Sequence, residues 1–226
     1  MPDERRTDRG PHVDAEGVWC EVAEAARAGT FAGRPALFLD RDGVIVEEIA
    51  YLHRPEDVQV IAGAGEVIAA ANRAGIPVVV VTNQSGIGRG YYGWREFAAT
   101  QARIAGELAA FDAAWDMVVA CPYHRHARPP YDRDDHPDRK PNPGMLRRAE
   151  RRLGVALARS WIVGDRWLDM AAGRAAGAAG GLHVATGYGG DVEERHKAAA
   201  QAAESFAVDT GNSIADALDL VDRLRA

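Results

Sequence analysis

Two acidic residues follow a short apolar run near the beginning of the chain. Residues 36–39 are all apolar and lead directly into Asp40, and Asp42 follows two positions later, before a glycine. An apolar run that ends at a turn signal indicates a strand buried on both faces. Because side chains at i and i+2 of a strand point the same way, we expect both carboxylates at its C-terminal end. Two charges that close repel by about 4 kcal/mol at an effective dielectric constant near 20, so the pair calls for a cation or a proton. The alternative is a turn that uses Asp and Gly only for local hydrogen bonds.

Beyond this run, apolar strands alternate with amphipathic helices. We expect strands at residues 36–39, 76–81, 117–121, 161–165 and 182–185, and helices at 63–74, 94–111, 142–153, 168–176 and 213–224. This alternation is typical of a parallel, doubly wound α/β sheet, whose binding crevice lies beyond the carboxyl ends of the strands.

Polar residues gather at these predicted strand ends. Thr82 and Asn83 follow the second strand, Asp165 follows the fourth, and Lys140 leads into a helix. A hydroxyl, a cation and three acids at one edge of a sheet predict a site for a phosphate group and a metal ion.

Composition excludes several classes of protein. The chain has 226 residues, of which 47% are apolar and 27% are charged, as in a globular α/β domain. The net charge of -6 argues against binding to nucleic acid or to a membrane surface. Two cysteines imply no disulfide framework, and the polar first residues and the lack of a long apolar run indicate no signal peptide and no membrane span. We therefore expect a soluble cytoplasmic protein.

Four segments resemble, in order, the four motifs of haloacid-dehalogenase-type phosphatases. They are residues 40–44 (DRDGV), 82–86 (TNQSG), 139–145 (RKPNPGM) and 163–170 (VGDRWLDM). The similarity runs from about residue 34 to 189 and is greatest to the subgroup of D,D-heptose 1,7-bisphosphate phosphatases and histidinol-phosphatases.

The resemblance implies a three-layer, Rossmann-like α/β fold whose parallel sheet has the strand order 3-2-1-4-5. Only about 30 residues separate the first two motifs, so we expect no large cap domain. The phosphatase domain would cover residues 35–226. Residues 1–34 would form an N-terminal extension with a packing helix at 13–28.

The resemblance also implies roles in catalysis. Asp40 would be the nucleophile that forms an aspartyl-phosphate, and Asp42 would be the general acid and base. Mg²⁺ would be bound by the Asp40 carboxylate, the Asp42 main-chain carbonyl and Asp165. Asp169 would position water molecules or Lys140 rather than bind the ion.

The remaining candidates would bind the substrate. Thr82 and the amide of Asn83 would hold phosphoryl oxygens, and Lys140 would offset negative charge on the nucleophile and in the transition state. Arg139 is a candidate for a second anionic group of the substrate. Arg166 would either reach the substrate or lie at the surface.

One loop departs from the pattern of the subgroup. Heptose bisphosphate phosphatases carry a structural zinc in the loop before the Arg-Lys pair, held by Cys-x-His and Cys-x-Cys, and only Cys121 of those thiolates is present here. Zn²⁺ would require a replacement set made of Cys121, His124, His136 and Asp138. In the alternative, zinc has been lost and the loop is held by prolines and apolar contacts.

The function implied is Mg²⁺-dependent hydrolysis of a small phosphorylated metabolite, as in D-glycero-D-manno-heptose 1,7-bisphosphate 7-phosphatases. Histidinol-phosphate phosphatase is the alternative among enzymes. A phospho-accepting receiver domain is the alternative of another class, although such a module would not need Asp42. We expect a phosphosugar as partner, chosen by loops that carry aromatic residues, and neither nucleic acid nor membrane.

Overall fold

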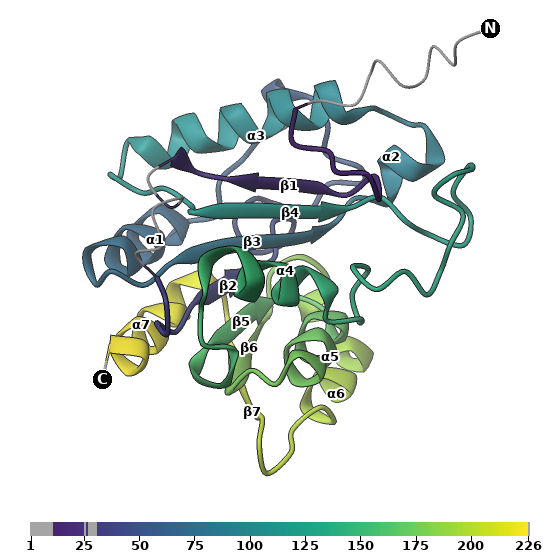
Figure 1. Ribbon diagram of the computed structural model, residues 1–226. Coiled ribbons are helices and arrows are strands. Elements are labelled where there is room, and N and C mark those ends of the chain that lie inside the picture. Colours follow the sequence, from purple (N-terminus) through teal and green to yellow (C-terminus); the bar gives the residue numbers. More distant parts are fainter. Residues whose placement is uncertain (1–10, 25, 27–30, 226) are drawn as a thin grey trace, which may run out of the picture.

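A seven-stranded sheet forms the centre of the protein (Figure 1). The computed structural model describes residues 11–24, 26 and 31–225. In sheet order the strands are β1 (Trp19–Val22), β4 (Met117–Cys121), β3 (Val78–Asn83), β2 (Leu37–Leu39), β5 (Trp161–Gly164), β6 (Gly180–Val184) and β7 (Ala207–Gly211). β1 and β4 are antiparallel, and the other neighbours are parallel.

The predicted order 3-2-1-4-5 is not the order of the whole sheet. The five expected strands are β2 to β6, which lie in the middle in the order β4-β3-β2-β5-β6, and the sheet adds β1 and β7 at its two edges. β7 lacks the apolar run that marks a buried strand, and none of its residues is fully buried. The prediction was therefore wrong about the extent and the edges of the sheet.

The predicted N-terminal helix is also wrong where the structure describes it. Residues 25, 27 and 28 of the expected range 13–28 lie outside the described part. The middle of the range is β1, which pairs with β4 so that Trp19 lies opposite Ala120. The Trp19 ring stacks on Trp94, 5.6 Å between centroids, and meets the edge of Phe97. Tertiary pairing and aromatic packing therefore override the helical spacing of the apolar residues.

Helices cover both faces of the sheet. They are α1 (Ala64–Arg73), α2 (Ser85–Arg89), α3 (Trp94–Ala109), α4 (Gly144–Leu153), α5 (Trp167–Ala176), α6 (Val192–Ala199) and α7 (Leu218–Arg225). One buried cluster joins α1, α3 and α7 to one face, and a second joins α4, α5 and α6 to the other. The apolar side chains of the strands alternate between these clusters, as expected for strands buried on both faces. Within the described residues, no helix is at once long enough and apolar enough to cross a bilayer.

Candidate active site

The carboxyl ends of three central strands meet at one edge of the sheet. β2 lies between β3 and β5 and is parallel to both, so that Leu39 is opposite Val80 and Val163. The residues that follow therefore come together around a cavity of about 320 Å³. Every residue predicted from the sequence to act in catalysis, to bind substrate or to bind magnesium lines it, namely Asp40, Asp42, Thr82, Asn83, Arg139, Lys140, Asp165 and Arg166.

Lys140 is the buried cation of this cavity. Its Nζ lies 2.8 Å from Asp40 Oδ2 and 2.6 Å from Asp169 Oδ1, and it donates to the Val81 carbonyl at 2.9 Å. Burial alone would lower the pKa of Lys140, but the Asp169 and Asp40 carboxylates outweigh burial and raise it. Lys140 therefore stays charged and fixes the orientation of Asp40.

Asp165 packs directly against the backbone of Gly43, in the turn that follows Asp40. Gly43 has a φ of 78°, and a Cβ at this position would collide with Asp165 Oδ2. Burial, followed by the charges of Asp40 and Asp169, raises the pKa of Asp165 well above the usual range of a carboxyl group. Without a further cation, the Asp165 carboxyl group therefore holds its proton to a higher pH than an ordinary carboxyl group does.

These acids make a donor set that suits a divalent cation. Asp40, Asp165 and Asp169 each offer a carboxylate oxygen, and these oxygens lie within 4.8 Å of one another. Oxygen donors are the ligands that Mg²⁺ takes in proteins. Lys140 pairs with both Asp40 and Asp169, whereas Asp165 has no ion pair with it and is left most in need of a cation. The residues thus fit Mg²⁺.

Asp42 is held by two neighbours that the sequence analysis did not single out. Arg41 donates to Oδ1 from Nε and to Oδ2 from Nη2, each at 3.0 Å, and Gln84 Nε2 donates to Oδ2 at 2.9 Å. β2 ends at Leu39, so Asp40 and Asp42 lie in the turn after the strand rather than on it. Both carboxylates nevertheless lie at the C-terminal end of β2, as expected, because both residues line the cavity. The strand geometry given as the reason does not apply to them.

Thr82 and Asn83, at the end of β3, are tied to other parts of the site. Thr82 Oγ1 accepts from the Gln84 amide at 2.9 Å. The Asn83 side chain accepts from the Lys140 amide and donates to the Lys140 carbonyl, both at 3.1 Å. Asn83 therefore anchors the backbone of Lys140, a contact that the motif alone did not reveal.

The outer part of the cavity is rich in arginine. Arg166 pairs with Glu194 at 3.1 Å and lies over the Tyr188 ring. Arg139 donates to the Tyr123 carbonyl at 2.8 Å. Arg89, which the sequence analysis did not single out, places Nη2 3.2 Å from His124 Nε2, and its buried Nε has no hydrogen-bond partner among the described residues.

Neither Arg89 nor Arg139 has a carboxylate within ion-pair distance in the part of the chain that the structure describes. Burial, with nearby Arg166 and Arg89, lowers the pKa of Arg139. Burial, followed by Arg139 and Arg89, lowers the pKa of His124 to about 4. Arg89, Arg139 and Arg166 thus place several positive charges in this part of the cavity, and Asp134 opposes their effect on both pKa values.

Glu48 is a further residue of the cavity that the sequence did not reveal. It is half-buried, and burial, followed by the charges of Asp42 and Asp40, raises the pKa of Glu48 to about 7. Of the tyrosines in the loops expected to choose the substrate, Tyr51 and Tyr92 line the cavity, whereas Tyr91 and Tyr123 do not.

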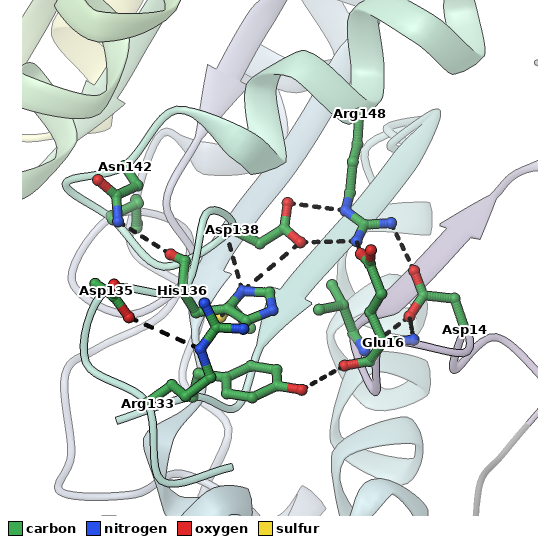
Figure 2. A network of polar contacts seen from close by, with 12 residues as sticks. Asp14, Glu16, Arg133, Asp135, His136, Asp138, Asn142 and Arg148 are labelled. Carbon is green, nitrogen blue, oxygen red and sulfur yellow. Dashed lines mark hydrogen bonds and ion pairs between the residues drawn. The ribbon is translucent and has the colours of Figure 1, made fainter. Parts of the chain in front are cut away.

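Three of the residues proposed to bind zinc, Cys121, His136 and Asp138, lie close together, but the fourth does not join them. His124 lies against Arg89 in the active-site cavity, away from the other three. Cys121 Sγ is 4.0 Å from His136 Nδ1, and both oxygens of Asp138 are bound by Arg148. Figure 2 shows the contacts of Asp138 with Arg148 and His136. Burial raises the pKa of the Cys121 thiol to about 12.

Among the described residues, the one group that could hold a metal ion is the Asp40 cluster. The zinc set Cys121, His124, His136 and Asp138 was therefore wrong as a metal site, because His124 is elsewhere and a guanidinium occupies Asp138.

Comparison with known proteins gives a consistent result. The sequence model of haloacid dehalogenase-like hydrolases matches residues 22–177. The D-glycero-beta-D-manno-heptose-1,7-bisphosphate 7-phosphatase of Mesorhizobium japonicum is 50% identical over 181 residues, which are 77% of this chain and 80% of that protein. The enzyme of the same name from Escherichia coli K12 is 37% identical over 153 residues, 68% of this chain and 80% of its own length.

Solved structures agree with these matches. A crystal structure from Mesorhizobium loti, described as that of a HAD-like phosphatase, matches with a TM-score of 0.82 and 42% identity. The match covers 95% of this chain and 97% of the Mesorhizobium loti chain. The D,D-heptose 1,7-bisphosphate phosphatase from B. bronchiseptica, solved with magnesium and phosphate, has a TM-score of 0.69 and 30% identity. That match covers 84% of this chain and 98% of the B. bronchiseptica chain.

Proposed function

This chain belongs to the haloacid dehalogenase-like hydrolase family and is a phosphoric monoester hydrolase, and we propose that it removes the 7-phosphate from a D-glycero-D-manno-heptose 1,7-bisphosphate. Relatives that carry this name match most of the chain. The motifs predicted from the sequence to carry phosphatase chemistry line one cavity, which supports the same activity.

The observation that carries the choice of substrate is the pair of guanidinium groups without carboxylate partners. Arg89 and Arg139 line the same cavity as Asp40, and within the described chain no acid pairs with either of them. Both arginines are only half-buried, but a partly desolvated cation without an anion favours a ligand that brings a second negative charge. A sugar bisphosphate has that charge. Histidinol phosphate has an amine instead, which the two arginines would repel.

In the proposed mechanism Asp40 attacks phosphorus, and the ester oxygen leaves with the sugar. Lys140 holds the Asp40 carboxylate in place and, at 2.8 Å, remains close enough to offset charge that develops on the transferred group. Thr82 and the main-chain amide of Asn83 would hold phosphoryl oxygens, while the Asn83 side chain keeps Lys140 in position. Water then attacks the aspartyl-phosphate and restores Asp40.

Asp42 would give a proton to the leaving oxygen and later take one from the attacking water. Its oxygens accept from Arg41 and Gln84, so proton transfer requires that one oxygen exchange such a donor for the substrate or the water. Gln84 also donates to Thr82 and accepts from the Tyr92 hydroxyl at 2.5 Å. Gln84 thereby links the general acid to the phosphate-binding strand end.

Mg²⁺, held by the Asp40 and Asp165 carboxylates and the Asp42 carbonyl, would supply the positive charge that lets a phosphate dianion approach these acids. We further propose that no large cap covers the site. Between β2 and β3 the described chain contains loops, a short 3-10 helix at Pro55–Asp57 and α1. Loop residues such as Tyr51 and Tyr92 would then contact the sugar.

The test is a comparison of substrates on the purified full-length chain. We expect release of one phosphate from heptose 1,7-bisphosphate in Mg²⁺, little turnover of histidinol phosphate, and no turnover by D40N. The same heptose with a single phosphate at position 7 should be hydrolysed with a higher KM. Preference for histidinol phosphate would refute the substrate, and phosphate release that persists in a chelator would refute the mechanism.

A further inference from the structure

Arg148 on α4 is the centre of a group of carboxylates (Figure 2). Its Nε and Nη2 donate to Oδ1 and Oδ2 of Asp138 at 2.8 and 2.7 Å. Nη1 donates to Asp14 Oδ2 at 2.6 Å, and Nη2 also donates to Glu16 Oε2 at 2.5 Å. The Arg148 side chain is only 12% exposed, and three carboxylates bind its guanidinium group.

The group connects three parts of the chain that are distant in the sequence. Asp14 and Glu16 belong to the N-terminal segment, Asp138 to the loop before Arg139 and Lys140, and Arg148 to α4. The Tyr123 hydroxyl adds a bond from the same loop to the Glu16 carbonyl, at 2.6 Å. The N-terminal segment is therefore bound to the loop that carries two active-site cations.

Asp138 directly precedes those two cations, and its surroundings leave little room for movement. It is 4% exposed, and a side chain at Gly144 would collide with Asp138 Oδ1 and with the Pro137 carbonyl. The Gly144 amide donates to that carbonyl at 2.8 Å, and the Asn142 side chain donates to the His136 carbonyl at 3.0 Å. The first turn of α4 and the loop are thus packed around the Asp138 carboxylate.

Zinc does not fit at this place. Arg148 takes both oxygens of Asp138, and His136 Nδ1 accepts from the Asp138 amide at 3.2 Å. The His136 ring stacks on Tyr123, 3.7 Å between centroids and 8° between planes. Both oxygens of Asp138 and Nδ1 of His136 are therefore already engaged within the protein.

We propose that the Arg148 guanidinium takes the place of a structural metal, and that by binding Asp138 on one side and Asp14 and Glu16 on the other it positions Arg139 and Lys140. Arg148 is thus a positioning residue that acts through Asp138. The N-terminal segment acquires a function as the outer half of this contact. The inference rests on the proposed roles of Arg139 and Lys140 in binding and catalysis.

The first experiment measures metal. The full chain, produced in zinc-supplemented medium and dialysed, is analysed by mass spectrometry for bound metals, and its melting temperature is measured with a chelator selective for zinc over magnesium. We expect far less than one zinc per chain and an unchanged melting temperature. One zinc per chain that the chelator removes with a loss of stability would overturn the proposal.

The second experiment compares R148M and R148K with R147M. Arg147 is the matched control, because it is on the same helix, is 43% exposed and pairs only with Glu150 in the described structure. We expect R148M to lower kcat/KM for the heptose bisphosphate about 10- to 100-fold, since a small misplacement of a catalytic group has effects of this size. R148K should recover only part of the loss, because an ammonium cannot bind both oxygens of Asp138 and the two N-terminal acids together. R147M should resemble the wild type.

Amide exchange distinguishes positioning from a general loss of stability. In R148M, we expect faster exchange at residues 136–141 and 12–18 and unchanged exchange in β2 and β3. Uniformly faster exchange, or wild-type activity in R148K, would overturn the proposal. If R148M does not fold, R148K decides. The metal and exchange measurements need no substrate, so they remain valid if heptose bisphosphate is not hydrolysed at all.

Discussion

Replacement of Lys140 by methionine tests the charge balance of the active site. Methionine keeps most of the length and volume but removes the ammonium that lies 2.8 Å from Asp40 and 2.6 Å from Asp169. At an effective dielectric constant near 20, each contact is worth about 6 kcal/mol before desolvation is counted. Burial of the ammonium offsets much of this sum, and loss of one partner of a buried ion pair typically costs about 3–5 kcal/mol.

We therefore expect K140M to lower the free energy of unfolding by about 3–5 kcal/mol at pH 8 without metal, measured by urea denaturation. The deficit should be smaller at pH 5, because the acids left without a cation can then bind protons. Added Mg²⁺ should restore part of the stability but not the activity.

The control is K197M, which removes an exposed lysine from α6 and should leave stability unchanged. If K140M were as stable as the wild type at pH 8, the ammonium would not neutralise the buried acids. The assigned role of Lys140 would then be wrong.

Three further changes test other residues of the cavity. Q84L removes a donor from Asp42 and should lower kcat roughly 10-fold with little change in KM; an equal rise in KM would refute the positioning of the general acid. E48Q should raise the melting temperature at pH 8 but not at pH 4. The reason is that the raised pKa of Glu48, about 7 in the folded chain against 4.5 as reference, makes the folded chain lose stability as pH rises through that window; no difference at pH 8 would refute it. R89Q should raise KM for the bisphosphate about 10- to 100-fold and leave KM for the monophosphate unchanged. The control R125Q, at an exposed position outside the cavity, should change neither KM. Equal effects of R89Q on both substrates would exclude a role of Arg89 in binding the second phosphate.

The sequence predicted the inner part of the site well, because its residues follow strands that must be buried. Asp40, Thr82 and Asp165 come directly after or at the ends of apolar runs, and parallel pairing brings such ends together whatever the details of the loops. Lys140 was found through its motif. Its two acidic partners and its anchor on Asn83 depend on packing across the sheet, which spacing does not encode.

Residues at the outer part of the site were missed for a related reason. Arg41, Glu48 and Gln84 lie in turns and loops, where side-chain direction has no simple period, and Arg89 ends the five-residue helix α2. The zinc hypothesis failed in the same way. It named Asp138 as a metal ligand, but the cation that binds the Asp138 carboxylate is Arg148, ten positions later on α4.

The fold shows the same limit. β3 and β4 were predicted because they are continuous apolar runs, whereas β1 and β7 are edge strands that are only partly buried. An edge strand is defined by the neighbour with which it pairs, and its own sequence carries a weaker signal. In β1 the spacing of apolar residues also fits a helix, and only the pairing with β4 and the contact of Trp19 with α3 decide the outcome.

The distribution of charge explains why the cavity suits a bisphosphate rather than a monophosphate. Each inner acid either pairs with a cation of the protein or is available to a metal ion. Lys140 pairs with Asp40 and Asp169, and Arg41 pairs with Asp42. Its outer arginines, in contrast, have no such anions among the described residues, apart from Arg166 with Glu194. A single phosphate at the inner acids would leave the positive charge of the outer part uncompensated. A substrate with phosphates at both ends of a sugar would satisfy both regions at once. In the function that we propose, the outer arginines select the substrate and the inner acids perform the reaction.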